Sequence, residues 1–192
     1  MKRSSNSASL HNPIYDIAAQ VFHKRGYDST SMSDIAHAAR LTKAGLYHHI
    51  ASKEMLLYTI LNYGMDLTDE IVMRPVLEIR DPLERLKQLI ARHLRLILQE
   101  RNHEVTVILH EDKSLRGTLR KKMNERKKHY IDFVEKVVAG VLPRRRKSKA
   151  RIAAFALLGM MNWCYQWYRP GGRITVPALV NGMTEIFLHG VA

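Results

Sequence analysis

Thr42, Lys43, Tyr47 and His48 place hydroxyl, ammonium, phenol and imidazole groups within a short stretch of the chain. Such groups donate hydrogen bonds to phosphate oxygens and to the edges of nucleic-acid bases. The sequence contains no Ser/His/Asp spacing, glycine-rich phosphate loop or nucleotide-binding fingerprint that would indicate a catalytic site. These residues therefore favour binding over catalysis, and we expect neither enzymatic activity nor a cofactor.

Two short helices are predicted to position these side chains. Ser31 and Asp34 form a helix-start pair, in which the hydroxyl accepts a free backbone N–H and the carboxylate favours the positive helix end. Thr42 can cap a second short helix over residues 43–49. The apolar stripe of the first helix consists of Ile35, Ala36 and Ala39. The spacing predicts a helix-turn-helix at about residues 31–50, whose second helix lies in the major groove of DNA.

Short matches on both sides of this motif keep a common register. They are Gly26-Tyr27, Ile35-Ala36, Leu46-Tyr47-His48-His49 and Ser52-Lys53-Glu54. Over about residues 11–62 the sequence resembles the DNA-binding domain of the TetR family. Two positions differ, because Arg40 stands where the family usually has a turn glycine and Ile50 where it usually has phenylalanine. If the turn requires a positive φ at residue 40, arginine costs on the order of 1 kcal/mol relative to glycine.

The position of each side chain in this motif predicts its contact with DNA. Lys53, together with backbone N–H groups at the start of the third helix, should bind phosphate, and Tyr47 can do so through its hydroxyl. Thr42, Lys43 and His48 are the candidates for contact with base edges. A merely polar helix surface is the alternative interpretation. The predicted DNA-binding set is Ser31, Ser33, Thr42, Lys43, Tyr47, His48 and Lys53.

Length and composition indicate a globular intracellular protein. A chain of 192 residues is long enough for one domain or two small ones, and its 46% hydrophobic content supports a core. The single cysteine, Cys164, allows no intrachain disulfide and should be packed in an apolar helix. The first ten residues are polar and no apolar stretch approaches the length of a bilayer span, so we expect a soluble, cytoplasmic protein without membrane contact.

The positive charge of the chain is concentrated in one segment. The formal net charge is +13, and residues 113–151 contain fifteen Lys/Arg against three Asp/Glu. A polyanionic partner is therefore expected. Because most of the excess charge lies outside the helix-turn-helix, DNA binding alone does not account for it. The alternative interpretation of this charge is a solvated basic face or a nonspecific affinity for DNA, without a specific polyanionic ligand.

Apolar spacing and helix-stop signals predict an all-α chain without strands or repeats. Residues 1–10 are expected to form a flexible basic arm. Helices are predicted at about 13–25, 53–73, 82–97, 102–110, 115–141, 150–168 and 177–188, besides those of the helix-turn-helix. About nine helices in this order resemble the TetR-family layout. The resemblance implies a DNA-binding domain over residues 11–62 and a ligand-binding and dimerisation domain over residues 63–192.

The segment GMMNWCYQWYRPGG, residues 159–172, is the second informative stretch. Gly159 would permit close approach of a second helix and the aromatic rings would supply contact area, which is typical of a dimer interface. Rings on another face of the same helix can line a ligand pocket. The stretch is similar to the corresponding helix of TetR-like repressors that respond to acyl-CoA thioesters in fatty-acid and sterol breakdown. The predicted effector-binding set is Asn162, Trp163, Trp167 and Arg169, with Arg116 and Arg120 for the phosphates.

Ten histidines raise the question of a metal site. His103, His110 and Glu111 could face one another, but no H-x₃-H pair or Cys/His cluster completes a ligand set. Hydrogen-bonded or solvent-facing histidines are the simpler interpretation, and no metal is expected.

These patterns together predict a homodimeric transcriptional repressor that binds double-stranded, palindromic operator DNA. A small hydrophobic effector, best matched by an acyl-CoA thioester, is expected to release it. One alternative is a drug- or metabolite-responsive repressor of an efflux operon, which needs no effector phosphates. Another, from a different class, is a basic architectural nucleic-acid-binding protein without an effector.

Overall fold

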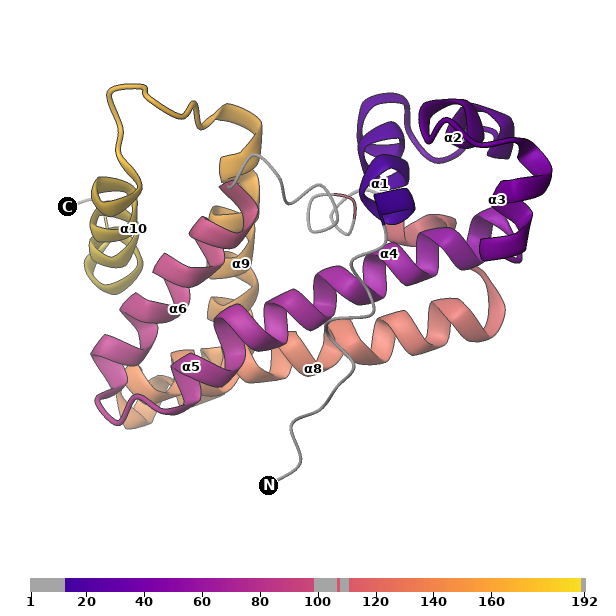
Figure 1. Cartoon of the computed structure of the whole chain (residues 1–192). Helices are drawn as coiled ribbons and strands as arrows, with labels where there is room; N and C mark the ends of the chain where they lie inside the picture. The colour runs from indigo at the N-terminus through magenta and orange to yellow at the C-terminus, as the bar shows by residue number, and fades with distance from the viewer. Residues whose placement is uncertain (1–12, 99–106, 108–110, 191–192) are drawn as a thin grey trace. The chain divides into compact units, whose positions relative to one another are not determined.

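The computed structural model describes residues 13–98, 107 and 111–190. Helices and connecting turns make up these residues, and no strand occurs among them, which confirms the predicted all-α fold (Figure 1). The predicted arm at residues 1–10 lies outside the described residues, as does most of the predicted helix at 102–110. Two compact units are present: residues up to 65 together with 103–124, and residues 66–102 together with 125–192.

The first unit contains the helix-turn-helix, formed by α2 (Met32–Ala38) and α3 (Lys43–His49). The predicted capping box is present, since Ser31 Oγ accepts a bond from Asp34 N at 3.1 Å and Asp34 Oδ2 accepts one from Ser31 N at 2.7 Å. Thr42 Oγ1 caps α3 by accepting a bond from Gly45 N at 3.0 Å. Ile35, Leu46 and other apolar residues of the two helices are buried. Local hydrogen bonding and burial therefore fix both helices.

The turn between α2 and α3 has the strained conformation that the sequence suggested. Arg40 has a φ of +56°, and it is the one residue other than glycine with a positive φ in the described part of the chain. Two backbone bonds close the turn, from Arg40 N to His37 O at 3.1 Å and from Leu41 N to Ala36 O at 2.8 Å. Ile50, the other departure from the family pattern, is 4% exposed and fills the core beneath α3.

Among the residues that the structure describes, three further α-helices contribute to the first unit. The first is α1 (Pro13–Arg25), which buries Ala18, Ala19 and Phe22 and ends where Gly26 adopts a φ of +79°. Ser52 Oγ accepts a bond from Met55 N at 3.1 Å at the beginning of α4 (Lys53–Leu67). The chain from residue 111 contributes a short 3₁₀ turn (Asp112–Ser114), the fully buried Leu115 and the start of α8 (Gly117–Val141).

The predicted helix at 53–73 is longer and less regular than expected. After α4 the chain continues as a π-helical turn (Thr68–Met73), in which Arg74 N bonds to Asp69 O, and then as α5 (Arg74–Leu77). Pro75 has no N–H with which to reach the carbonyl of Ile71, four residues earlier. Arg92 Nη1 donates to that carbonyl instead, at 3.3 Å. A side chain from another helix therefore replaces the missing backbone donor.

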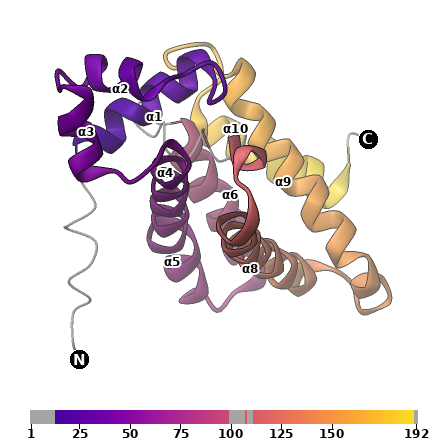
Figure 2. The same cartoon turned by 90° about the vertical axis from the view of Figure 1, so that its right-hand side faces the viewer.

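In the second unit α6 (Pro82–Leu98) packs against α9 (Ala150–Trp167) and α10 (Val176–His189), as Figures 1 and 2 show. Their bounds lie within a residue or two of the predicted helices. The basic stretch Arg144–Lys149, which lies between the helices predicted at 115–141 and 150–168, forms a 3₁₀ turn that leads directly into α9. The core of this unit includes Leu86, Leu89, Ile90, Leu94, Val134, Val138, Leu157 and Met161.

Candidate DNA-binding and effector sites

One side of α3 is buried and the other is open to solvent. Leu46 is fully buried, whereas Thr42, Lys43, Tyr47 and His48 are exposed; Tyr47 keeps 46% of its surface accessible. The four predicted DNA-contacting side chains of this helix are thus all available to a ligand. α3 thus has one buried face and one exposed face, as a recognition helix needs.

The predicted contacts on α2 differ in their availability. Ser31 and Ser33 are both exposed. The Ser31 hydroxyl already donates to Asp34 Oδ2 at 2.6 Å, and this bond together with the Ser31 backbone bond lowers the pKa of Asp34. Ser31 therefore acts first as a helix cap. A contact from Ser31 to DNA would require its O–H to leave the Asp34 carboxylate.

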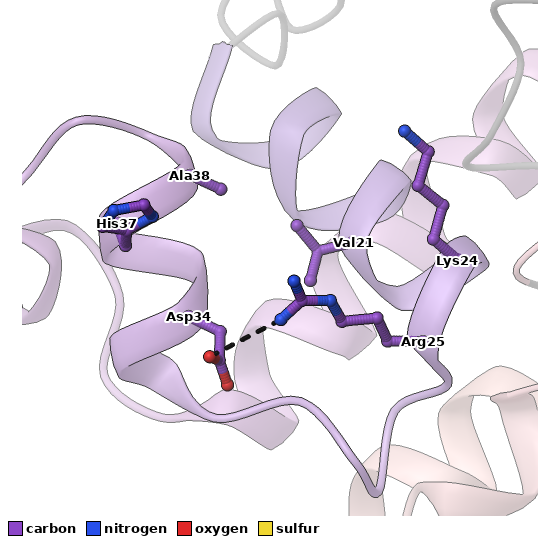
Figure 3. A pocket seen from close by; sticks show the side chains of 6 residues that line it. All are labelled: Val21, Lys24, Arg25, Asp34, His37 and Ala38. Carbon is purple, nitrogen blue, oxygen red and sulfur yellow. Dashed lines mark ion pairs between the residues drawn. The ribbon is translucent and has the colours of Figure 1, made fainter.

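A cavity of about 310 Å³ lies between α1 and α2 in the same unit (Figure 3). It is lined by Val21, Lys24, Arg25, Asp34, His37 and Ala38. Arg25 Nη1 and Asp34 Oδ1 form an ion pair at 3.6 Å, with both side chains well exposed. Exposed pairs of this kind contribute only about 0–1 kcal/mol. None of the predicted DNA-binding residues lines this cavity, so it is distinct from the surface of α3.

Lys53, the predicted phosphate contact at the start of α4, is part of a small cluster. Its ammonium lies 4.1 Å from the centre of the Tyr27 ring. Tyr27 N donates to Glu111 Oε1 at 3.0 Å, and Arg116 N donates to Glu54 Oε1 at 2.7 Å. Sequence reasoning noted Tyr27 and Glu54 only as part of the family resemblance. Glu111, which was considered only as a metal ligand, accepts a backbone hydrogen bond instead.

The second unit contains a buried polar cluster built on His93 of α6. His93 is 5% exposed, and its Nε2 lies 2.9 Å from Asn162 Oδ1 while its Nδ1 lies 2.7 Å from the Tyr130 hydroxyl. The amide oxygen can only accept, so Nε2 carries the proton, and Nδ1 accepts the hydrogen of Tyr130. Burial lowers the pKa of His93 to about 4 and raises that of Tyr130. His93 is therefore neutral with both nitrogens bonded.

Acidification should destabilise the protein through His93. Its pKa of about 4 in the folded chain lies below the ordinary value of 6.5, so between these limits the unfolded state binds more protons. The free energy of unfolding should then fall as the pH drops from about 6.5 to about 4, by on the order of 3 kcal/mol. Urea unfolding at pH 7 and pH 5 measures this. His93→Gln should lose much of the pH dependence, whereas His189→Gln, at an exposed position, should keep it.

The predicted effector-binding residues fall in both units. Asn162 contacts His93, while Trp163 and Trp167 are 65% and 42% exposed on one face of α9, and Arg169 is exposed just beyond the helix. Arg116 and Arg120 are exposed at the start of α8, in the first unit. Within the second unit, the Asn162 side chain therefore joins the buried cluster, whereas the Trp163 side chain faces outward.

Part of the basic segment is neutralised by ion pairs. Arg151 Nη1 contacts Asp132 Oδ1 at 2.5 Å and Glu135 Oε2 at 2.8 Å, and Lys128 Nζ lies 2.6 Å from Asp132 Oδ2. Arg126 pairs with Asp66 at 2.8 Å. The basic side chains described as exposed beyond these include Arg144, Arg146, Lys147 and Lys149. Exposed basic side chains therefore gather at the 3₁₀ turn before α9, and others, such as Arg116 and Arg120, lie at the start of α8.

Neither a metal centre nor a membrane span is found among the described residues. These residues include no group of three His, Cys, Asp or Glu side chains placed to hold a metal ion. None of their helices is both long and apolar enough to cross a membrane.

Comparison with known families decides the wider assignment. The family model for tetracyclin repressor-like C-terminal domains matches residues 80–191, and that for bacterial regulatory proteins of the tetR family matches residues 14–59. The chain belongs to the TetR family. It is accordingly a DNA-binding transcriptional regulator and not an enzyme, as the sequence predicted.

Several TetR-family relatives match along nearly their whole length. The repressor KstR2 of Rhodococcus jostii is 29% identical, and the match covers 98% of this chain and 94% of that protein. The crystal structure of AibR in complex with isovaleryl coenzyme A and operator DNA has a TM-score of 0.83 at 39% identity, covering 93% of this chain and 98% of that one. A TetR-family regulator from Bordetella parapertussis reaches a TM-score of 0.84 at 28% identity, covering 98% of this chain and 97% of that one.

Proposed function

We propose that this TetR-family repressor acts as a homodimer that leaves a palindromic operator when an acyl-CoA thioester binds its C-terminal domain. The main support for both ligands is its similarity, over nearly the full chain, to AibR, whose structure holds isovaleryl coenzyme A and operator DNA together. Release of the operator is the step that the dissociation assay below tests. Similarity to the KstR2 repressors supports repression, and similarity to the fatty acid metabolism regulator of Bacillus subtilis supports a role in lipid metabolism.

The DNA-binding half of the proposal rests on the exposed side of α3. Tyr47 and Lys53 are assigned to the sugar-phosphate backbone, because a phenol or an ammonium reaches phosphate without reading sequence. Lys43 and His48 are assigned to base edges, with Thr42 beside them at the start of the helix. Ser33 supplies a hydroxyl from α2. The paired heads of a dimer would contact two half-sites about one helical turn of DNA apart, or a multiple of it.

The proposed dimer interface is the outer face of α9 and α10. Ile152, Phe155 and Trp163 are between 51% and 73% exposed on α9. A Cβ added at Gly159 on the same helix, or at Gly182 on α10, would meet no heavy atom within 4 Å beyond the backbone of its own helix, so both positions are open. Glycine inside a helix costs roughly 0.5–1 kcal/mol relative to alanine. Close approach of a partner helix would require a small residue at both positions, and this would offset the cost of glycine.

The effector half of the proposal combines apolar and cationic groups. An acyl-CoA has an apolar acyl group and a head with three phosphate groups, so it needs rings and methylenes at one end and guanidinium groups at the other. Trp167, which is 42% exposed, and Asn162 are assigned to the acyl and thioester part. Arg169 is assigned to the phosphates. Arg116 and Arg120 belong to the first unit and are left out of this site. Trp163, on the same face of α9, is assigned to the effector and to the partner surface alike.

Acyl-CoA thioesters should dissociate the repressor–operator complex, while the corresponding free acids at equal concentration should not. Fluorescence anisotropy with isovaleryl-CoA, a long-chain acyl-CoA and a ring-bearing acyl-CoA measures the release. Allosteric couplings of about 1–3 kcal/mol predict that affinity for operator falls roughly 5- to 150-fold. Trp167→Ala should blunt this response without abolishing operator binding.

Calorimetry then separates the competing functions. Coenzyme A alone serves as the control for binding through the phosphates without an acyl group. Equal binding of free acid and thioester would replace the proposal by an efflux-type repressor, whose effector needs no phosphates. Binding of neither, together with weak sequence preference on DNA, would favour the architectural protein.

A further inference from the structure

We propose that Tyr27 is a positioning residue for Lys53, and that the segment of residues 111–116 holds this pair in place for contact with a DNA phosphate. The inference rests on the proposed role of Lys53 in DNA binding. It extends that role to residues outside the helix-turn-helix, among them Glu111, which lies 84 positions after Tyr27 in the sequence.

The geometry around the Tyr27 ring supports a positioning role. The Lys53 ammonium lies 4.1 Å from the centre of the ring, within the range of a cation–π contact. Phe22, which is 1% exposed, packs against the same ring with centroids 5.3 Å apart and planes inclined by 53°. A buried ring thus fixes the aromatic surface on which Lys53 rests. Lysine has a long, flexible stem, and confining it before DNA arrives reduces the entropy lost on binding.

The backbone around this pair is tied down by two carboxylates. Glu111 Oε1 accepts the Tyr27 N–H at 3.0 Å, and Glu54 Oε1, one residue after Lys53, accepts the Arg116 N–H at 2.7 Å. Leu115 is fully buried between these two contacts along the chain. The segment of residues 111–116 is therefore hydrogen-bonded to Tyr27 and to Glu54, the residue after Lys53.

Gly26 contributes to this arrangement through its backbone conformation, because a Cβ at this position would meet Glu111 only at an ordinary van der Waals distance. Its φ is +79°, and a Cβ there would lie 3.6 Å from Glu111 Oε1. The positive φ turns the chain after α1 so that the next N–H meets the Glu111 carboxylate. Burial, followed by the Glu54 charge, raises the pKa of Tyr27, so the phenol stays neutral.

A double-mutant cycle tests the inference. Operator affinity should be measured for the wild-type protein, Tyr27→Leu, Lys53→Ala and the combination, in the full-length chain. Tyr27→Leu should weaken binding about 3- to 10-fold when Lys53 is present and hardly at all in the Lys53→Ala background. Tyr27→Phe keeps the ring and should retain wild-type affinity. Equal weakening by Tyr27→Leu in both backgrounds would show a purely structural role and overturn the proposal.

A second readout needs no DNA. The Lys53 ε-methylene protons are next to an ammonium that lies 4.1 Å from the centre of the Tyr27 ring. They should show upfield NMR shifts that persist in Tyr27→Phe and vanish in Tyr27→Leu. Unshifted Lys53 resonances in the wild-type protein would overturn the pairing. If the shifts are present but Lys53→Ala leaves operator affinity unchanged while Tyr47→Ala lowers it, the positioning role is wrong and DNA binding stands. No operator binding by the wild-type protein would contradict the proposed function itself.

Glu111→Ala tests the segment separately, also where Tyr27→Leu fails to fold. Removing a carboxylate raises the affinity for DNA by charge alone, so Asp28→Ala, an exposed acidic residue of the same unit, is the matched control. Glu111→Ala should bind operator about 3-fold or more weakly than Asp28→Ala, and this difference should disappear in the Lys53→Ala background. Equal affinities of the two variants would remove residues 111–116 from the proposal.

Discussion

Replacing both Tyr47 and Lys53 by alanine should lower operator affinity by at least about 100-fold. Each proposed contact joins a donor to an anionic phosphate, and hydrogen bonds to charged groups contribute roughly 1.5–3 kcal/mol apiece. Leu46 and Ile50 hold α3 from beneath and are untouched by these changes, so the fold should persist. Gel-shift or anisotropy titrations on operator and on unrelated duplex DNA measure the effect.

The way in which each variant changes affinity for different DNA sequences is as informative as the size of the loss of operator affinity. Tyr47→Ala and Lys53→Ala should weaken binding to all sequences. Lys53→Ala should also reduce the slope of log affinity against log salt concentration by about one, because one phosphate contact is lost. His48→Ala and Lys43→Ala should in addition change base preference. Lys24→Ala, an exposed lysine of α1, is the control. If the Tyr47→Ala, Lys53→Ala double variant binds operator like the wild type, α3 is not the DNA-reading element.

Introducing a carboxylate at both Phe155 and Trp163 should convert the proposed dimer into a monomer. These side chains are 51% and 65% exposed in one chain, and the proposal buries them against a partner. An unpaired charge in such an interface costs several kcal/mol. The monomer should also bind operator on the order of 100-fold more weakly, because the second head loses the high effective concentration that linkage gives it.

Light scattering and sedimentation at micromolar concentration measure the oligomeric state of Phe155→Glu, Trp163→Glu. The matched control is Leu77→Glu in α5, since Leu77 is 59% exposed but lies away from α9 and α10 in the sequence. It should remain dimeric. A wild-type protein that is monomeric by mass while binding its operator tightly would rule out the proposed interface.

The features that sequence reasoning predicted well are local ones. The Ser31–Asp34 capping box, the Thr42 cap and the positive φ of Arg40 each depend on residues within a few positions of one another. The helix-stop signal at Gly26 placed the end of α1 correctly for the same reason. The side chains of α3 that the sequence assigned to DNA are exposed, while Leu46 among them is buried.

What sequence reasoning missed depends on contacts between distant residues. The π-helical turn at Thr68–Met73 leaves the apolar pattern intact, and the Arg92 bond to Ile71 O comes from another helix. His93 lies 37 and 69 positions from its partners Tyr130 and Asn162. No periodicity connects such residues, because they meet only when the helices have packed. Asn162 was expected at the effector, and the structure adds a buried partner that no local signal suggested.

The packing of Cys164 has a practical consequence for measuring how the protein moves. The side chain is fully buried, Sγ donates to Met160 O at 3.3 Å, and burial raises the pKa of the thiol to about 11. Thiolates are the reactive species, so this sulfur should resist maleimide and nitroxide reagents at neutral pH. The chain has no other cysteine. A cysteine placed at His49, an exposed position of α3, would therefore be the only labelled site in each protomer. Pulsed electron paramagnetic resonance on a doubly labelled dimer would then give the separation of the two heads directly, on and off the operator.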